Sequence, residues 1–420
     1  MNAQAKRVAE YLKKYTFEET GNLILFPADN STIIETIDVK GSEIKKYVNE
    51  YWTARQRRSS SIHEISYRAC FKAQLPRFFI ELLTEPGDII YDPFSGRGTT
   101  VIEAGLLGRQ VLANDINPLS KIITSPRLAI PKSDDVYAKL NEIPIDKSLK
   151  ADIDLSMFYH PQTEAELVSI KKYLEDRKLS GEEDDVDRWI RMVATNRLTG
   201  HSTGFFSVYT LPPNQAVSQD RQIKINIKRN QEPEYRDTKK IINRKTATLL
   251  NKIQNNEIGN LRNAAKTAVF IEKDARETYE IEDNQVSLTV TSPPFLDIVQ
   301  YSKDNWLRCW FNSIDTEAIE KRITMSKKVE DWSAVMGEVF KQLYRITKPG
   351  GWVAFEVGEV RNGKINLEEY VVPLGWEAGF NCLGIIINLQ EFTKTSNIWG
   401  IRNNNFGTNT NRIALFQKNG

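Results

Sequence analysis

The sequence predicts an α/β protein with a mostly parallel, doubly wound sheet that is interrupted by a long insertion. An apolar strand, a helix and a second strand follow one another between residues 89 and 116, and such alternation is typical of parallel sheets. A second alternating stretch begins near residue 268. The 420 residues exceed one typical domain, so we expect a complete core and a substantial addition.

The first half of this core is expected in residues 61–120. Apolar runs and helical spacing predict a helix, a strand, a second helix and a second strand, at residues 75–83, 89–92, 99–107 and 110–114. Pro86-Gly87 is a turn signal before the first strand, and Gly108 is placed to end the second helix. A helix therefore leads into the first strand of the sheet.

The second half of the core is expected in residues 266–420. Apolar runs predict five strands, at residues 269–271, 286–290, 352–357, 383–389 and 412–417. Apolar residues three and four apart predict an amphipathic helix over residues 331–346, which Pro349-Gly350-Gly351 would end. The last two strands resemble a closing antiparallel pair, so this half would complete the sheet.

Residues 121–265 differ in sequence pattern from the two halves of the core and are expected to form an inserted region. Helical patterns appear at residues 164–176 and 185–193, and residues 200–214 form a polar loop. The later part is basic, with a net charge of +7 that comes from Arg221, Lys224, Lys228, Arg229, Arg236, Lys239, Lys240, Arg244, Lys245 and Lys252 against three acidic residues. Such a run is either a solvated face or a surface that contacts phosphates.

Residues 1–60 are expected to form a separate N-terminal segment. Arg55, Arg57 and Arg58 lie beside Tyr51 and Trp52 and form a second basic patch. Basic side chains next to aromatic ones suit contact with nucleic acid, and a solvated face is again the alternative.

The composition excludes several classes of protein. Hydrophobic residues make up 40% and charged residues 27% of the chain, and no apolar run approaches the roughly 18 residues of a membrane span. Without a secretory signal at the N-terminus, we expect a soluble, cytoplasmic protein. The three cysteines and three histidines are scattered along the chain, so we expect neither a disulfide framework nor a metal site.

The segment Asp92-Pro93-Phe94-Ser95-Gly96-Arg97-Gly98-Thr99-Thr100 lies where a strand turns into a helix, the place where an open α/β sheet binds a nucleotide-like ligand. Gly96 and Gly98 would let the backbone approach the ligand, and Asp115, at the end of the next strand, would accept hydrogen bonds from two ribose hydroxyls. The alternative is a plain strand-to-helix turn with a capping Asp115. Val101 replaces the third glycine of a dinucleotide motif, which disfavours a dinucleotide enzyme.

The segment Thr291-Ser292-Pro293-Pro294-Phe295 also follows an apolar strand, so it lies at the same edge of the sheet. Its two prolines fix the backbone. The amino group of a nucleobase is a poor nucleophile, and accepting its two N–H bonds at Ser292 Oγ and the Pro293 carbonyl would aim its lone pair at a methyl donor. Phe295 would stack on the base. The alternative is a Pro-Pro turn with a core phenylalanine.

Together these two segments resemble the S-adenosylmethionine-dependent DNA amino-methyltransferases, which methylate the amino group of cytosine or adenine. The resemblance covers about residues 60–118 and 266–420 and implies a Rossmann-like methyltransferase fold with S-adenosylmethionine as cofactor. It leaves an insert between Asp115 and Asp274, which would be the target-recognition region.

The resemblance also implies the roles of individual residues. Residues 71–76 would close over the methionine part of the cofactor, and Asp274 would hold its adenine amine. The implied cofactor-binding residues are Phe71, Asp92, Phe94, Gly96, Gly98, Thr99, Asp115, Ile116, Asp274, Ala275 and Thr291. The implied catalytic residues are Ser292, Pro293, Pro294 and Phe295. DNA contacts are expected from Arg55, Arg57, Arg58, Lys224, Lys228, Arg229, Lys239, Lys240, Arg244 and Lys245.

Ser292 stands where adenine enzymes of the family usually carry Asp or Asn, so the expected target is the 4-amino group of a cytosine flipped out of double-stranded DNA. The resemblance implies a restriction-modification setting, in which a cognate restriction endonuclease acts separately. The alternatives are methylation of the adenine 6-amino group, methylation of a guanine amine in RNA, and a non-catalytic DNA-recognition subunit.

Overall fold

The computed structural model describes residues 2–16, 31–52, 59–68, 70–211, 215–294, 301–322, 328–360, 365–389 and 411–420. Arg55, Arg57, Arg58 and Phe295, which the sequence nominated as site residues, lie outside the described residues. No helix in the described ranges is both long enough and apolar enough to cross a lipid bilayer.

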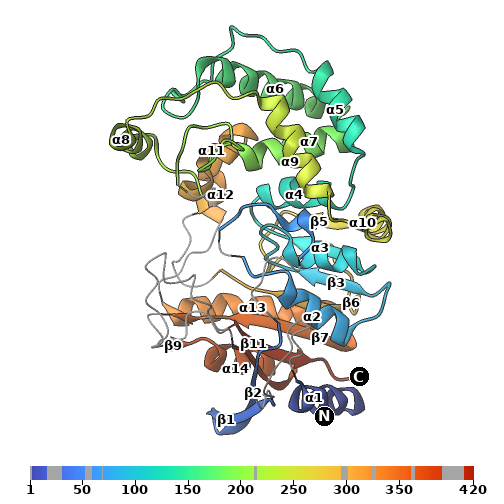
Figure 1. The fold of residues 1–420 in the computed structure, drawn as a ribbon. Helices are drawn as coiled ribbons and strands as arrows, with labels where there is room; N and C mark the ends of the chain where they lie inside the picture. Colours follow the sequence, from blue (N-terminus) through green and yellow to red (C-terminus); the bar gives the residue numbers. More distant parts are fainter. Residues whose placement is uncertain are drawn as a thin grey trace, which may run out of the picture.

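In the described part of the chain, nine strands form one sheet in the order β1-β2-β10-β11-β7-β6-β3-β4-β5 (Figure 1). The strands are β1 (Ile33–Val39), β2 (Ser42–Asn49), β3 (Ile89–Asp92), β4 (Gln110–Asn114), β5 (Val269–Ile271), β6 (Val286–Thr291), β7 (Thr347–Val357), β10 (Asn381–Asn388) and β11 (Asn411–Gln417). Two short strands, β8 (Glu359–Val360) and β9 (Ile365–Asn366), pair separately. The strands predicted from apolar runs are confirmed.

The run β7-β6-β3-β4-β5 is parallel throughout. Strand β11 lies between β7 and β10 and is antiparallel to both, so the predicted closing antiparallel pair is confirmed. The N-terminal residues do not stand apart from the core: β1 and β2 form a hairpin whose second strand pairs with β10 in parallel. The hairpin thereby extends the edge of the sheet.

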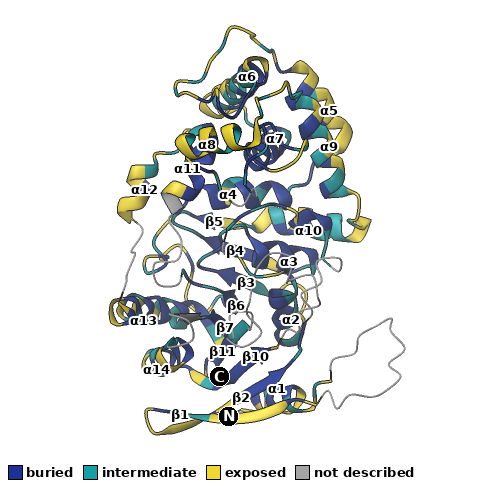
Figure 2. Ribbon diagram, turned by 60° about the vertical axis from the view of Figure 1, so that its left-hand side comes forward, coloured by how far each residue is buried: buried dark blue, intermediate teal, exposed yellow. Residues whose placement is uncertain are grey.

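Helices cover both faces of the sheet (Figure 2). One face carries α1 (Ala3–Lys14), α2 (Gln74–Leu83), α3 (Thr99–Leu106) and α10 (Asn255–Thr267), and the other carries α13 (Val329–Ile346) and α14 (Glu368–Ala378). Helix α10 comes from the expected insert, yet it packs on α3 and β4 and completes the crossover to β5. A Cβ on Gly105 of α3 would lie 2.9 Å from Leu261 of α10, so the glycine permits this close crossing.

The strand after α13 begins earlier than predicted. The helix ends at Ile346 as expected, but Lys348-Pro349-Gly350-Gly351 is not a loop and instead forms the first half of β7. The β6–β7 register shifts between Val286 and Leu288, and the Gly350 amide donates to the Lys418 carbonyl at 3.0 Å. A proline and a glycine with positive φ are tolerated here because the strand is irregular at this point.

A second, helical part stands beyond the β5 edge of the sheet (Figure 1). We call it the helical lobe, which comprises residues 119–211, 215–250 and 301–322. It consists of α4 (Leu119–Thr124), α5 (Ser133–Glu142), α6 (Pro161–Leu179), α7 (Asp185–Arg197), α8 (Gln219–Arg229), α9 (Thr238–Leu250), α11 (Tyr301–Phe311) and α12 (Thr316–Arg322). Trp189 is fully buried at its centre and donates to Thr246 Oγ1 at 3.0 Å.

The last two helices of the lobe come from the second half of the sequence. The Asn312 side chain, at the end of α11, donates to Thr195 Oγ1 of α7 at 2.9 Å. The Trp306 indole donates to the Val217 carbonyl at 3.1 Å. Helix α11, which comes after the Ser-Pro-Pro motif in the sequence, therefore belongs, by its packing, to the helical lobe.

Candidate active site

The sheet brings the two sequence motifs side by side. β3 and β6 are parallel neighbours, and Asp92 and Thr291 are their last residues. The Thr291 hydroxyl donates to Asp92 Oδ1 at 2.7 Å across 199 residues of sequence. Because carboxyl ends of parallel strands share one edge, the residues that follow each strand line a common space.

A cavity of about 320 Å³ lies at this edge. Most of the predicted site residues line it, namely Phe71, Phe94, Gly96, Asp115, Ile116, Asp274, Ala275, Ser292, Pro293 and Pro294. Val335, Met336 and Val339 of α13 add an apolar wall that the sequence analysis did not assign to the site. The size and the mixture of an apolar wall with a few polar groups suit a small organic ligand.

Four of the predicted residues lie behind this cavity, not in its lining. Asp92 and Thr291 are buried and hydrogen-bonded to each other, and burial raises the pKa of Asp92 to about 7. Thr99 opens α3 and accepts a hydrogen bond from Arg97 Nε at 3.1 Å. A Cβ on Gly98 would lie 2.2 Å from the Thr124 side chain, so this glycine accommodates helix α4 instead of a ligand.

Gly96 and Asp115 form the turn that faces the cavity. Gly96 has φ of +51°, which favours glycine, and its amide donates to Asp115 Oδ2 at 2.7 Å. The Asn117 amide donates to Asp115 Oδ1 at 2.9 Å. Burial raises the pKa of Asp115 to about 6, and the two amide bonds oppose this rise. Each carboxylate oxygen keeps a further lone pair with which to accept a ligand hydroxyl.

Asn114 joins the loop after β3 to the loop after β5. Its side-chain amide donates to the Pro93 and Lys273 carbonyls at 3.1 and 3.0 Å and accepts from the Lys273 amide at 3.1 Å. Asp274 is thereby held in the cavity wall, where the Arg276 guanidinium binds both of its carboxylate oxygens at 2.9 and 2.7 Å. Partial burial raises the pKa of Asp274, but Arg276 outweighs it and the net pKa is lowered.

Arg97 fixes the segment that includes Phe71. Its guanidinium donates to the carbonyls of Ile65 and Phe71 at 3.1 and 3.3 Å. Arg127 is fully buried and donates to the Arg97 carbonyl in turn. Because these bonds reach main-chain atoms, they set the path of the backbone over the cavity.

The Ser-Pro-Pro segment is held by two contacts that local sequence does not reveal. Ser292 lines the cavity beside the carboxylate of Glu356, whose pKa it lowers through hydrogen bonding, and the Asn411 amide donates to the same carboxylate. The Trp332 indole donates to the Pro294 carbonyl at 3.0 Å. Within the described ranges, no hydrogen bond reaches the Pro293 carbonyl.

Glu356 is the functional candidate that sequence reasoning missed. It lies on β7, is 8% exposed and lines the cavity with Asn411. Burial raises the pKa of Glu356 to about 7, against the hydrogen bonds from Asn411 and Ser292. A single carboxylate within the apolar stretch Trp352–Val357 was the available signal, because a buried charge requires a partner.

The structure divides the basic residues of the expected recognition region. Those on α8 are exposed, namely Arg221, Lys224, Lys228 and Arg229. Those on α9 are largely engaged within the protein: Lys239 and Arg244 donate to main-chain carbonyls, Lys245 pairs with Glu64, and Lys240 pairs with Asp237. The basic residues therefore fall into two groups, an exposed group on α8 and a group on α9 that is largely hydrogen-bonded or ion-paired within the protein.

Comparison with protein-family models matches residues 6–124 to the N6_N4_Mtase model, which is described as DNA methylase. This chain is similar to DNA methylases. The matched range includes the Asp92–Thr100 loop and Asp115. The strand order and the antiparallel β11 fit the methyltransferase fold that the sequence resemblance implied.

Two curated proteins are similar to the chain. The type II methyltransferase M.MvaI of Kocuria varians is 25% identical over 293 residues, which are 64% of this chain and 60% of that protein. The type II methyltransferase M.MjaII of Methanocaldococcus jannaschii is 33% identical over 76 residues, which are 18% of this chain and 14% of that protein. The chain thus spans less than two thirds of the length of either relative.

Solved structures of methyltransferases are also similar. A putative DNA modification methylase from Thermus thermophilus, complexed with S-adenosyl-L-methionine, is 22% identical with a TM-score of 0.23 and covers 35% of this chain and 54% of its own. A SAM-dependent methyltransferase from Methanosarcina mazei is 10% identical with a TM-score of 0.32 and covers 81% and 97%. These scores are low, so the fold assignment depends on the sheet itself.

Proposed function

We propose that this chain is a DNA amino-methyltransferase of the type II restriction-modification class, and that it uses S-adenosylmethionine to methylate the 4-amino group of cytosine. The observation that carries the proposal is the cavity that both motifs line, at the edge where the Thr291 hydroxyl donates to Asp92 and joins them. The similarity to DNA methylases supports the class of substrate.

The cavity fits the proposed cofactor. Asp115 has free lone pairs for two ribose hydroxyls, and Ile116 and Phe94 offer apolar surface to an adenine ring. Asp274, fixed by Arg276, presents a carboxylate to an exocyclic amine. The cofactor supplies an electrophilic methyl group when it is bound, and the residues of this chain have only to orient it.

Ser292 acts as a hydrogen-bond acceptor toward the target base. When its one hydroxyl proton is donated to Glu356, which lines the same cavity, Ser292 Oγ offers lone pairs to the base. Ser292 Oγ and the Pro293 carbonyl each accept one N–H bond of the base, which localises the lone pair on the amine nitrogen. Trp332 holds the end of the segment by its bond to the Pro294 carbonyl.

Glu356 also takes up the proton that the amine releases. Methyl transfer leaves a positively charged amine, and one of its N–H protons passes to Ser292 Oγ while the Ser292 proton passes to Glu356 Oε. The pKa of Glu356, about 7, matches a proton acceptor that works near neutral pH. The charge on the amine is neutralised, and no other base is needed.

Nucleoside analysis tests the function. Purified protein is incubated with plasmid DNA and the cofactor, and the digested DNA is examined by mass spectrometry. We expect 4-methylcytosine, and its loss with Ser292→Ala while Ser202→Ala, at an exposed position in the lobe, keeps full activity. Detection of 6-methyladenine alone would refute the cytosine assignment, and transfer to RNA but not to DNA would refute the substrate class.

A further inference from the structure

Helix α8 exposes two of its three isoleucines and buries a glutamine, while the third isoleucine, Ile225, is half-buried and packs against the core. Ile223 and Ile227 are four residues apart on one face and are 42% and 75% exposed, whereas Gln222 is buried. An ordinary surface helix has the opposite arrangement, with its apolar stripe on the core. An exposed apolar stripe flanked by charge indicates a surface that contacts another molecule.

The inward face of α8 is fixed by hydrogen bonds. Gln222 donates to the Tyr209 carbonyl at 3.0 Å and to Asn226 Oδ1 at 2.7 Å. Asn226 donates to the Met157 carbonyl at 2.7 Å. The Arg229 guanidinium lies 3.7 Å from the centre of the Tyr209 ring. These contacts fix the orientation of α8, and in that orientation Ile223 and Ile227 are exposed.

The outward face is also strongly basic. Lys224 and Lys228 are exposed one helical turn apart beside the isoleucine stripe, and Arg221 continues the basic row toward the N-terminal end of the helix. Neither lysine forms an ion pair with a residue that the structure describes. Asp220 is the one acidic residue of α8. This differs from α9, where Lys239 and Lys245 are engaged within the protein.

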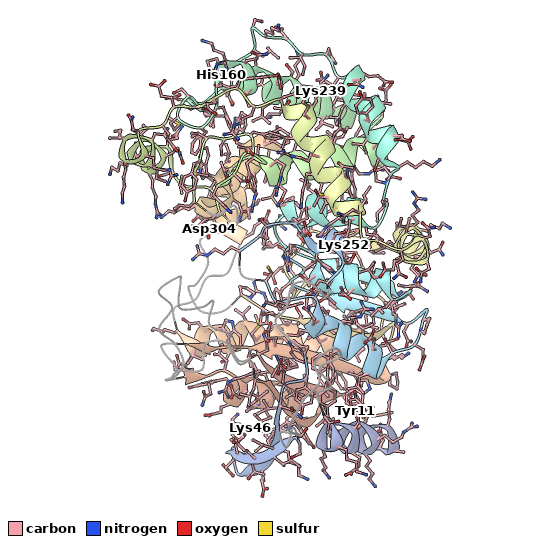
Figure 3. The ribbon with its side chains drawn as sticks, viewed as in Figure 1. Tyr11, Lys46, His160, Lys239, Lys252 and Asp304 are labelled. Carbon is pink, nitrogen blue, oxygen red and sulfur yellow. The ribbon has the colours of Figure 1, made fainter. Side chains whose placement is uncertain are left out.

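The residues that lead into α8 are hydrogen-bonded to helix α11. The Ala216 amide donates to the Asp304 carbonyl of α11 at 3.0 Å, and the Trp306 indole donates to the Val217 carbonyl. Helix α11 begins at Tyr301, shortly after the Ser-Pro-Pro segment. Figures 1 and 2 show α8 and α11 close together on the same side of the lobe, and Figure 3 places Asp304 at the lower margin of the lobe, toward the sheet.

We propose that α8 lies in the major groove of duplex DNA, with Ile223 and Ile227 against base edges and Lys224, Lys228 and Arg221 on the phosphates beside the groove. This inference rests on the proposed function and adds the element that reads the target. A major groove about 12 Å wide admits an α-helix, and thymine methyl groups are apolar features within it. The charge of the helix complements the phosphates.

The lysine pair is tested first, by salt-dependent binding. A fluorescein-labelled 24-base-pair duplex of mixed sequence is titrated by anisotropy at several salt concentrations. With Lys224→Ala/Lys228→Ala, the slope of log affinity against log salt should become shallower by about 2, since each lost phosphate contact removes about 0.9. Lys252→Ala/Lys266→Ala removes the same charge from exposed positions just before α10 and within it, and α10 lies away from α8 (Figure 1), so the slope should stay unchanged.

The isoleucine pair is tested by sequence specificity. Genomic DNA from cells that express Ile223→Ser/Ile227→Ser is mapped for methylated positions and compared with DNA from cells that express the unaltered protein. We expect at least a tenfold fall in modification at the normal sites, or modification of related sequences. Both residues are exposed, so the variant should bind S-adenosylmethionine with unchanged affinity, which verifies that it is folded.

Three outcomes would overturn the inference. Equal salt slopes for the α8 and α10 variants would mean that α8 does not contact phosphates. Unchanged methylation maps with the isoleucine variant would mean that α8 does not read bases, and a change in oligomeric state without any change in DNA affinity would assign the face to a second copy. If one of these results is obtained while the unaltered protein methylates plasmid DNA, only the inference about α8 is refuted. If the unaltered protein does not methylate DNA, the proposed function itself is refuted.

Discussion

Replacing Glu356 with glutamine tests the link between the buried carboxyl group and Ser292. Glutamine has nearly the same shape, so packing on β7 is preserved. Its side chain carries an NH₂ group and an oxygen, and the Asn411 NH₂ group competes with the Ser292 hydroxyl for that oxygen. When the glutamine NH₂ group faces Ser292, the serine proton points into the cavity, where it opposes the N–H bonds of the base.

The expected size of the effect follows from the hydrogen bond that is lost. A hydrogen bond to a charged group contributes about 1.5–3 kcal/mol, and about 1.36 kcal/mol corresponds to a factor of ten in rate. The value of kcat/KM at pH 8 should therefore fall roughly 10- to 150-fold by the same relation.

The assay is transfer of a labelled methyl group to plasmid DNA between pH 5.5 and 9. In the unaltered protein, kcat/KM should rise as Glu356 loses its proton, around its pKa of about 7, and the Glu356→Gln profile should lack this rise. Glu377→Gln, at an exposed position on α14, is the matched control and should behave as the unaltered protein does. A Glu356→Gln variant with the same rate and the same pH profile would refute the proposed role of the carboxyl group.

Three further predictions concern stability. Thr291→Val removes the bond to buried Asp92 and should lower the free energy of unfolding by about 1–3 kcal/mol in a urea titration; an unchanged transition would show that this bond contributes nothing. Gly98→Ala places a Cβ 2.2 Å from Thr124 and should cost more than Gly181→Ala, which has a similar φ of +75° but open space around it, so equal costs would exclude the steric explanation. Burial raises the pKa of Asp92 from 3.8 to about 7, so the folded state binds its proton more tightly, and this contribution to stability is complete below pH 3.8 and lost as pH rises through 7. Chemical unfolding at pH 4 and pH 8 should show a smaller pH dependence for Asp92→Asn, and an unaltered dependence would contradict the assignment.

Local sequence determined the elements that carry the site. Apolar runs and a glycine or proline at their ends set the bounds of β3, α3, β4 and β6, because burial and backbone freedom are properties of neighbouring residues. Alternation of strand and helix implied a parallel sheet, and a parallel sheet places the ends of β3 and β6 at one edge. Residues of the Asp92–Thr100 loop and of the Ser292–Pro294 segment accordingly line one cavity, although Asp92, Gly98 and Thr99 lie behind it.

Tertiary structure decided which groups meet. Glu356 of β7 and its hydrogen-bond partner Asn411 of β11 line the same cavity as Ser292, and their proximity follows from a strand order that no short segment encodes. Periodicity also could not reveal that α8 is held by hydrogen bonds of Gln222 and Asn226 together with Ile225, because the surface on which a helix packs decides which of its faces is buried. Packing likewise decides the environment of each basic residue in residues 221–252. The sequence shows their charge, but only the structure shows that the lysines of α8 are exposed, whereas Lys239 and Lys245 of α9 are bonded to other residues of the protein.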